Sequence, residues 1–250
     1  MEPSNDDPLL HHFQRYLGEV SASDKAHACK AAFSQALAEL GEDPEFGRLD
    51  QDVTVELVEA NIDRASHTLV THGMSRRPMN VPPEAQRGVP ENFRFAELTI
   101  GLPFAWPLDD AALAEPEHRW PFLLLARLAQ FPFAKGTWLA EGHSVPNGQP
   151  PQPYAETTEQ CCALIAQPTE VEEGFKQLRI SAGRRGGDGV YQPGKQVSFY
   201  GVVPIYRDEL DFLLDKGASD LLDRLETQRV TEVVSPARRT AMRKRKFWFF

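Results

Sequence analysis

The sequence predicts an α+β fold in which a mixed, mainly antiparallel β-sheet is flanked by helices. Segments with the apolar pattern of β-strands dominate the middle of the chain, whereas helical patterns lie toward its ends and at two interior points. This order does not match the regular alternation of strand and helix that is typical of a parallel sheet. With 250 residues, of which 41% are hydrophobic and 25% charged, the chain can bury an ample core.

The predicted centre of the sheet is a strand over residues 196–206. Its apolar side chains are Val197, Phe199, Val203 and Ile205 on one face and Tyr200, Val202 and Tyr206 on the other. A strand that is apolar on both faces is covered on both sides, and it is therefore central in its sheet. Pro204 cannot donate a ladder hydrogen bond and predicts the end of this strand. We expect Asp208 to cap a helix that Gly217 ends, and Ser219 to cap a second short helix.

The other elements follow from the same patterns. Residues 1–50 are predicted to form a helical segment that packs on the domain, with Ser21 and Asp24 as a capping box and Gly41 as a helix end. Further strands are expected at 52–60, 67–72, 93–102, 138–144, 160–166 and 174–181, and a largely buried helix at 121–131 with Pro121 in its first turn. Loops are expected at 73–90, 145–154, 167–173 and 183–194. The main domain then covers residues 51–236, and residues 237–250 form a basic, aromatic tail.

The charge of the chain is unevenly distributed. The net charge is −9, but six basic residues and no acidic residue lie after position 237. Residues 1–237 therefore carry 21 basic and 36 acidic side chains, a net charge of −15. Such a body repels nucleic acid and membrane phosphates and suits a basic protein partner, although acidity can also serve solubility alone.

The cellular compartment is predicted from three features. The apolar runs are far shorter than the roughly 20 residues that a membrane span needs. The first eight residues are acidic and polar and do not resemble a signal peptide. The three cysteines, two of them adjacent, cannot form a disulfide framework. We therefore expect a cytoplasmic protein.

No motif in the sequence predicts a chemical reaction. Residues 189–196 come close to a phosphate-binding P-loop, but Gln196 replaces the Ser or Thr that would hold magnesium, and the glycines precede a strand instead of a helix. His67 and His72 are five residues apart on a predicted strand and face opposite sides, which does not favour a metal site. Glu97 has no second carboxylate or histidine at a readable spacing. We therefore predict no catalytic residue, metal, cofactor or small-molecule substrate.

The tail combines six basic residues with the four aromatic residues 247–250. Such a segment could bind an acidic partner, nucleic acid or a membrane surface. We favour the interpretation that the aromatic side chains dock on the protein's own apolar surface, because four free aromatic residues would promote aggregation. The basic residues would then meet the acidic body.

Five segments together resemble the Suppressor of fused domain family. They are 71–79 (THGMSRRPM), 95–102 (FAELTIGL), 120–128 (WPFLLLARL), Gly142-His143 with Asn147-Gly148, and 202–210 (VVPIYRDEL) leading to Leu221-Leu222. They occur in the family's order and span roughly residues 50–236. The resemblance implies a mixed α/β fold that binds proteins and performs no chemistry.

The family also implies where a partner would bind. We name Leu128, Glu141, Gly142, His143 and Asn147 as the candidate partner-binding residues. Eukaryotic relatives, which have an additional C-terminal lobe, restrain Gli-type transcription factors, and they carry a Tyr and an Asp where this chain has Leu128 and Gly142. Binding of a Gli-like peptide is therefore not expected here. Single-lobe relatives are mostly bacterial, and many are regarded as immunity proteins that neutralise toxins.

Three functional hypotheses result. The first is a cytoplasmic, non-enzymatic immunity protein whose acidic face steers a basic toxin domain in and covers its active site. The alternative is a regulatory adaptor that captures a signalling or transcription protein along an exposed sheet edge. The third is an enzyme, for which Glu97 and His143 would be the best residues.

Overall fold

The middle layer of the structure is a mixed sheet of seven strands. The computed structural model describes residues 7–47, 49, 51–62, 64–85, 93–184, 191–192 and 194–242, and all statements on the fold refer to these residues. The strands follow the order β1 (Thr54–Val58), β2 (Ser66–His72), β3 (Ala96–Pro103), β9 (Lys195–Ile205), β5 (Cys162–Ala166) and β4 (Ser144–Pro146), and β6 (Gln177–Ile180) also pairs with β9. Only β3 and β9 are parallel among these pairs. The predicted mixed, mainly antiparallel sheet is therefore confirmed. Two short strands, β7 (Gly183–Arg184) and β8 (Tyr191–Gln192), pair with each other.

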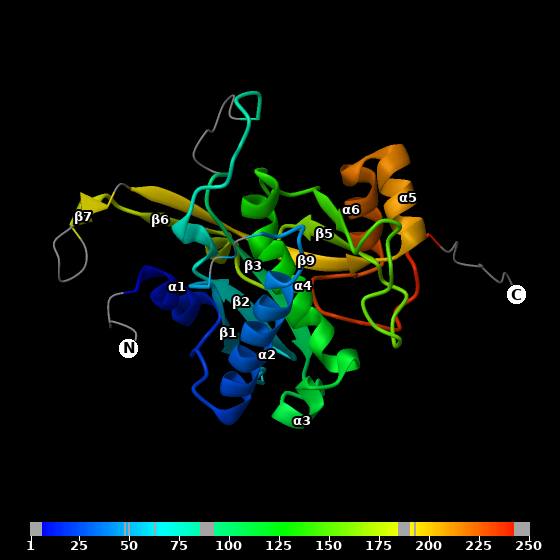
Figure 1. Ribbon diagram of the computed structural model, residues 1–250, viewed down its shortest axis with the longest axis horizontal. Coiled ribbons are helices and arrows are strands. Elements are labelled where there is room, and N and C mark those ends of the chain that lie inside the picture. The colour runs from blue at the N-terminus through cyan, green and yellow to red at the C-terminus, as the bar shows by residue number, and fades with distance from the viewer. Residues whose placement is uncertain are drawn as a thin grey trace, which may run out of the picture.

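Helices cover both faces of the sheet. They are α1 (Pro8–Tyr16), α2 (Asp24–Gly41), α3 (Asp110–Leu113), α4 (Pro116–Lys135), α5 (Arg207–Lys216) and α6 (Ala218–Thr227), with 3-10 turns η1 (Met74–Arg76) and η2 (Glu173–Lys176). Figure 1 shows α2 and α4 side by side across the sheet, with α1 near one end of the molecule and α5 and α6 near the other. None of the helices in the described ranges is both long and apolar enough to cross a membrane.

The strand β9 is the centre of this arrangement, as its sequence predicts. Tyr200 and Val202 belong to the core under α2 and α4. On the opposite face, Val197 and Phe199 pack with α1, and Val203 and Ile205 pack with α5 and α6. Both faces of β9 are therefore covered, by different helices at its two ends.

The prediction that β9 ends at Pro204 is wrong by one residue, because the strand continues to Ile205. The carbonyl of Ile205 accepts the Cys161 N–H and so points toward β5. Neighbouring residues of a strand alternate in the side to which their backbone groups point, so the backbone of Pro204 faces away from β5. There its carbonyl accepts a hydrogen bond from Arg238, and the missing N–H costs no bond to β5.

Several predicted helix starts are wrong. The helix α4 begins at Pro116, five residues before Pro121, and it contains both Pro121 and Pro132. Tyr206, and not Asp208, is the N-cap of α5, and Glu209 accepts the Tyr206 N–H in its first turn. The helix α6 begins at Ala218 after Gly217, so Ser219 does not cap it.

The N-terminal cap prediction is also wrong in position. The N-cap of α2 is Ser23, whose hydroxyl accepts the Ala26 N–H, while Ser21 and Ser23 both donate to Glu59. The predicted strand 138–144 is not formed, because a turn with a positive φ of 85° at Gly142 replaces it and the strand β4 starts only at Ser144. The start of the loop predicted at 145–154 is therefore strand. The other predicted strands are present: β1, β5 and β6 are shorter than predicted, β2 begins one residue earlier, and β3 begins three residues later and ends one residue later. The first residues of the predicted strand 174–181 belong to the 3-10 turn η2.

Buried ionisable groups link α1, β1, β2 and β3. The His72 side chain lies 2.9 Å from Asp7 and 3.2 Å from Glu56, which also pairs with Lys30 at 2.8 Å. Burial alone would lower the pKa of His72, but the hydrogen bonds to the two carboxylates raise this pKa to about 9. The His72 imidazolium thus joins the first helix to the sheet.

The carboxylate of Glu97 is fully buried beside this group. It accepts hydrogen bonds from the Thr71 hydroxyl at 2.7 Å and from the backbone N–H groups of Gly73 and Ser75 at 3.1 and 2.9 Å. Burial raises the pKa of Glu97 above its ordinary value, although these bonds oppose the rise. The segment 71–75, which belongs to one of the family-like motifs, is therefore shaped around this side chain.

Candidate protein-binding surface

The two helices α5 and α6 form a hairpin whose inner side is apolar. Leu210, Leu213, Leu221 and Leu225 pack against Cys162, Leu164, Val203 and Ile205 of β5 and β9. Helical spacing of these leucines in the sequence places them on one side of each helix. The other side of the hairpin is left facing solvent at one end of the molecule (Figure 1).

The outer side of this hairpin is acidic. Six exposed carboxylates lie on it, namely Asp208, Asp211, Asp215, Asp220, Asp223 and Glu226, against three exposed cations. Arg207 pairs with Asp211, Lys216 lies 3.0 Å from Asp215, and Arg224 stacks on the Phe212 ring. These three cations therefore already have partners within the hairpin. The remaining carboxylates Asp220, Asp223 and Glu226 form an acidic face on α6.

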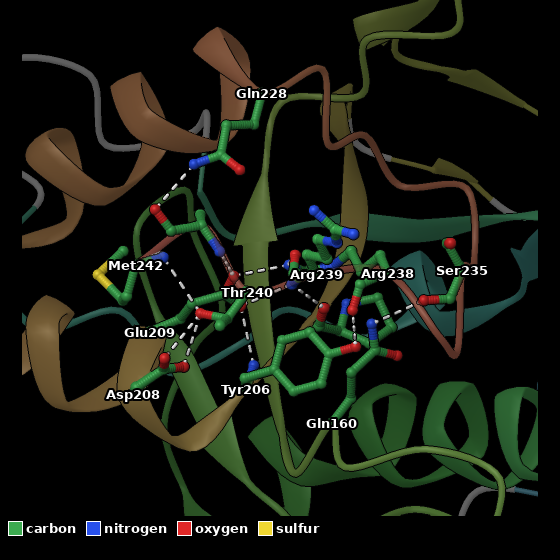
Figure 2. A network of polar contacts seen from close by, with 12 residues as sticks. Gln160, Tyr206, Asp208, Glu209, Gln228, Ser235, Arg238, Arg239, Thr240 and Met242 are labelled. Atoms are coloured by element: carbon green, nitrogen blue, oxygen red, sulfur yellow. Dashed lines mark hydrogen bonds and ion pairs between the residues drawn. The ribbon is translucent and has the colours of Figure 1, made fainter. Parts of the chain in front are cut away.

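A buried ion pair anchors the base of the hairpin (Figure 2). Glu209 is fully buried, and both of its oxygens accept hydrogen bonds of 2.6 Å from the Arg238 guanidinium. The same carboxylate accepts the Tyr206 N–H and the Ala241 N–H. A carboxylate bound in this bidentate way is fixed in position as well as neutralised. Arg238, the first basic residue of the tail, thus meets an acidic residue of the body.

The segment that carries Arg238 is held along its length (Figure 2). The Tyr206 hydroxyl donates to backbone carbonyls of this segment, including that of Arg238, and burial raises the pKa of Tyr206 above its ordinary value. Thr240 donates to Asp208 at 2.8 Å, and Gln228 of the α6 end donates to the Ala241 carbonyl at 2.8 Å. The hairpin is therefore fixed to the sheet end and is not a free appendage.

A groove runs beside this network. Its volume is about 750 Å³, and the charged side chains that line it include Glu156, Glu159, Asp208, Asp211, Arg207 and Arg239. Its two sides come from residues 156–159 before β5 and from the start of α5 with residues 236–242. The groove extends the acidic side of the hairpin toward the end of the sheet.

The loop Glu141–His143, which replaces part of the predicted strand 138–144 and holds three of the predicted partner-binding residues, lies next to the hairpin. A Cβ atom at Gly142 would lie 2.9 Å from the Ala218 Cβ at the start of α6. The Gly142 N–H donates to Ile165, and the His143 carbonyl accepts the Ile165 N–H, so β5 holds the loop. Glu141 is exposed and accepts a hydrogen bond from Gln167. His143 packs edge-on against Trp138, and burial lowers its pKa.

The other two predicted positions lie apart from this loop. Leu128 is fully buried in the main core on α4, so its side chain can affect a partner only through packing. Asn147 is half-buried in the turn after β4, where its amide donates to the carbonyls of Gln152 and Pro153. The structure therefore brings Glu141, Gly142 and His143 together beside α6, and it places Leu128 and Asn147 elsewhere.

The sequence did not reveal the anchor of the hairpin. Tyr206 and Glu209 are three residues apart, a spacing that could have suggested a cap with Glu209 in the first turn. Arg238 is 29 residues further along the chain, and no local pattern links it to Glu209. The described part of the tail ends at Met242, so the prediction for the aromatic residues 247–250 lies outside the described residues.

The residues that could have supported chemistry are separated. Glu97 is enclosed by the segment 71–75, whereas His143 contacts Trp138 near α6, so the structure gives them no shared contact. Among the residues that the structure describes, no group of three His, Cys, Asp or Glu side chains is arranged to hold a metal ion. Lys195, in the P-loop-like stretch, donates to the Ser75 carbonyl at 2.6 Å and lies over the Phe95 ring. The stretch itself lies partly outside the described residues.

Comparison with known proteins gives a family. The family model of the Suppressor of fused protein (SUFU) matches residues 51–239, which is most of the chain. The chain belongs to the Suppressor of fused family. Members of this family are non-enzymatic, regulatory domains that bind proteins, and the resemblance found in the sequence motifs is confirmed. A comparison with curated proteins found no match.

Solved structures of the Suppressor of fused family resemble the chain at low sequence identity. The crystal structure of a SUFU homologue from Neisseria gonorrhoeae FA 1090 is 15% identical, with a TM-score of 0.48 over 86% of this chain and 98% of that chain. The structure of the Sufu–Fu complex is 15% identical, with a TM-score of 0.47 over 85% and 92%. Drosophila Suppressor of fused is 16% identical, with a TM-score of 0.47 over 76% of this chain and 42% of that one.

Proposed function

We propose that the protein binds a protein partner through the hairpin surface, which we define as the exposed sides of α5 and α6 together with the loop Glu141–His143. The observation that carries this proposal is the excess of exposed carboxylates on a hairpin that Glu209 and Arg238 hold rigidly to the sheet. Membership of a family of protein-binding domains supports it. A fixed surface with one predominant charge gives a partner a defined site to recognise.

The partner in this proposal is a basic toxin domain, and the protein acts in the cytoplasm as its immunity protein. The carboxylates Asp220, Asp223 and Glu226 attract the cationic surface with which such a domain binds its own substrate. Once bound, the hairpin surface covers the toxin's active site and no chemical step is needed. Attraction of this kind raises the association rate and weakens with salt, because the Debye length falls from about 10 Å at 0.1 M to about 3 Å at 1 M.

The test expresses the proteins that are encoded beside this chain, and we expect one of them to be a basic domain that stops growth. Co-expression of the two proteins should rescue growth, and the purified pair should bind with an affinity that falls as the salt concentration rises. A second toxin of similar charge from another locus serves as the control for specificity. Failure to bind or to rescue would contradict the immunity function, and binding that does not depend on salt would contradict the role of the acidic surface.

The adaptor alternative has one structural observation in its favour. In the described part of the chain, β6 pairs with β9 along one side, and its residues alternate between exposed and half-buried positions. An extended peptide could add to its outer edge by backbone hydrogen bonds. The outer edge of β1 is less available, because the Ser21 N–H already donates to the Leu57 carbonyl. Peptide-array binding that an Arg179→Pro substitution abolishes, without any effect on toxin rescue, would favour the adaptor.

A further inference from the structure

The described part of the chain ends at Met242, which lines the acidic groove beside α5. Contacts fix this end in place. The Thr240 hydroxyl donates to Asp208 at 2.8 Å, and the Met242 N–H donates to Thr240 at 3.1 Å (Figure 2). The residues that follow Met242 are therefore joined to the body at a fixed point on the wall of the groove.

Three exposed carboxylates on the walls of the groove make no ion pair with any described residue. They are Glu156, Glu159 and Asp208. Of the cations on the walls, Arg207 and Arg238 already pair with other carboxylates, which leaves Arg239. The open side of the groove thus has an excess of negative charge that an occupant can reach.

The segment after Met242 has the complementary chemistry. Residues 243–246 are Arg-Lys-Arg-Lys, and residues 247–250 are Phe-Trp-Phe-Phe. The cations thus follow the fixed point directly, and the aromatic residues come after them. Along α5 the groove ends at Asp211, and Leu214 lies one helical turn further on the same side. Its side chain is 72% exposed and offers apolar surface to an aromatic residue.

The length of this segment is sufficient to cover the groove. Eight extended residues span at most about 26–29 Å. The ten residues of α5 rise by only about 15 Å along the helix axis. A linked segment also acts at an effective concentration of about millimolar, so contacts that are too weak to hold two separate molecules together are enough.

We propose that residues 243–250 dock in this groove as a ligand supplied by the chain itself. The basic residues 243–246 meet Glu156, Glu159 and Asp208, and the aromatic residues extend toward Leu214. The docked segment covers the α5 side of the hairpin surface, so a basic partner must displace it to bind there. This competition rests on the proposed function, whereas docking of the segment does not.

The test of docking needs no partner. It compares the indole N–H resonance of Trp248 in the full chain with that in a synthetic peptide of residues 243–250, and Trp248→Phe identifies this resonance in the chain. At low salt we expect the two positions to differ. Glu156→Lys combined with Glu159→Lys should reduce this difference at least about fourfold, because the reversed charges repel residues 243–246.

The matched control is Glu19→Lys with Glu84→Lys, which reverses two exposed charges outside the groove and should leave the Trp248 resonance where it is in the unchanged protein. A second variant, Leu214→Ala, should reduce the difference about twofold. A Trp248 resonance at the position of the free peptide in the unchanged protein would overturn the proposal without any variant. Equal effects of the groove variant and the control would exclude the groove as the docking site.

Competition is tested separately, by the association rate with the basic partner. Arg243→Gln with Lys244→Gln weakens docking and should raise the rate about two- to fivefold. Arg94→Gln with Arg179→Gln, the same loss of charge at exposed residues outside the groove and the hairpin surface, should raise it less. Equal rates for the two variants would contradict competition and leave docking in place. If no partner binds at all, the proposed function fails, and the resonance of Trp248 alone decides on docking.

Discussion

The two ends of β9 bury carboxylates in different ways. At the end that carries the hairpin, Glu209 accepts two hydrogen bonds from the Arg238 guanidinium. At the other end, Glu97 is held by a hydroxyl and two backbone N–H groups, and its charge helps to raise the pKa of nearby His72. A guanidinium stays charged at every pH at which proteins fold, whereas an imidazole loses its proton. The hairpin end should therefore keep its structure over a wide pH range, and the α1 end should not.

The largest expected effect comes from removing the guanidinium at the hairpin end. Arg238→Ala leaves the fully buried Glu209 without its cation, and we expect a loss of about 3–5 kcal/mol in the free energy of unfolding. Urea denaturation at pH 7 measures it. The matched control is Arg207→Ala, which breaks an exposed pair with Asp211 and should cost less than about 1 kcal/mol.

A second substitution separates the stability that is lost to the unpaired buried charge from the stability that is lost to missing packing. Combining Arg238→Ala with Glu209→Gln should recover part of the loss, because the uncompensated carboxylate is then removed. If Arg238→Ala costs no more than Arg207→Ala, the ion pair does not anchor the hairpin.

The next effect is a pH dependence at the α1 end. The pKa of His72 is raised to about 9 in the folded state, so the folded protein holds this proton more tightly than the unfolded chain. This contribution is complete below pH 6.5 and is lost as the pH rises through about 9. At 1.36 kcal/mol per pH unit it amounts to about 3 kcal/mol at most.

Urea denaturation of the unchanged protein and of His72→Gln between pH 6 and 10 measures this contribution. The difference in stability between them should shrink as the pH rises, whereas the difference between the unchanged protein and the double variant Arg238→Ala with Glu209→Gln, which leaves no unpaired buried carboxylate at the hairpin end, should stay nearly constant. Equal pH slopes for the two variants would contradict the contrast between the two ends.

A smaller effect is expected at the bonds that hold Glu97. Thr71 donates to Glu97 and accepts the Leu98 N–H at 2.8 Å, so Thr71→Val leaves two buried polar groups less well satisfied. We expect a loss of about 1–3 kcal/mol at pH 7. Thermal unfolding compared with Thr227→Val, at an exposed residue near the end of α6, checks it. A loss no larger than that of the control would mean that Glu97 is held by its backbone donors alone.

The sequence predicted the parts of this protein that depend on local pattern. The alternating apolar residues of 197–205 were enough to place β9 at the centre, and the leucines of 210–225 were enough to predict two helices over it. Helix starts were less predictable, since Pro116 and Pro121 are both compatible with a first turn and only packing of the whole helix decides between them.

The sites depended on residues that are far apart in the chain. Glu141, Gly142 and His143 were named from the family pattern, but their position beside Ala218 follows from the pairing of β4 with β5. The Glu209–Arg238 pair joins segments 29 residues apart, and no spacing rule reports such a pair. Long-range contacts of this kind need the fold.

The association rate of the protein with its basic partner tests the hairpin surface most directly. The double substitution Asp220→Lys and Asp223→Lys reverses two exposed charges of α6, and Glu19→Lys with Glu84→Lys reverses two exposed charges outside the hairpin surface. Stopped-flow mixing at low salt should show a rate about tenfold or more lower for the α6 variant, and a much smaller change for the control, because steering depends on where the charges lie. Equal changes for both variants, or none for either, would contradict the proposal that the partner binds at α5 and α6.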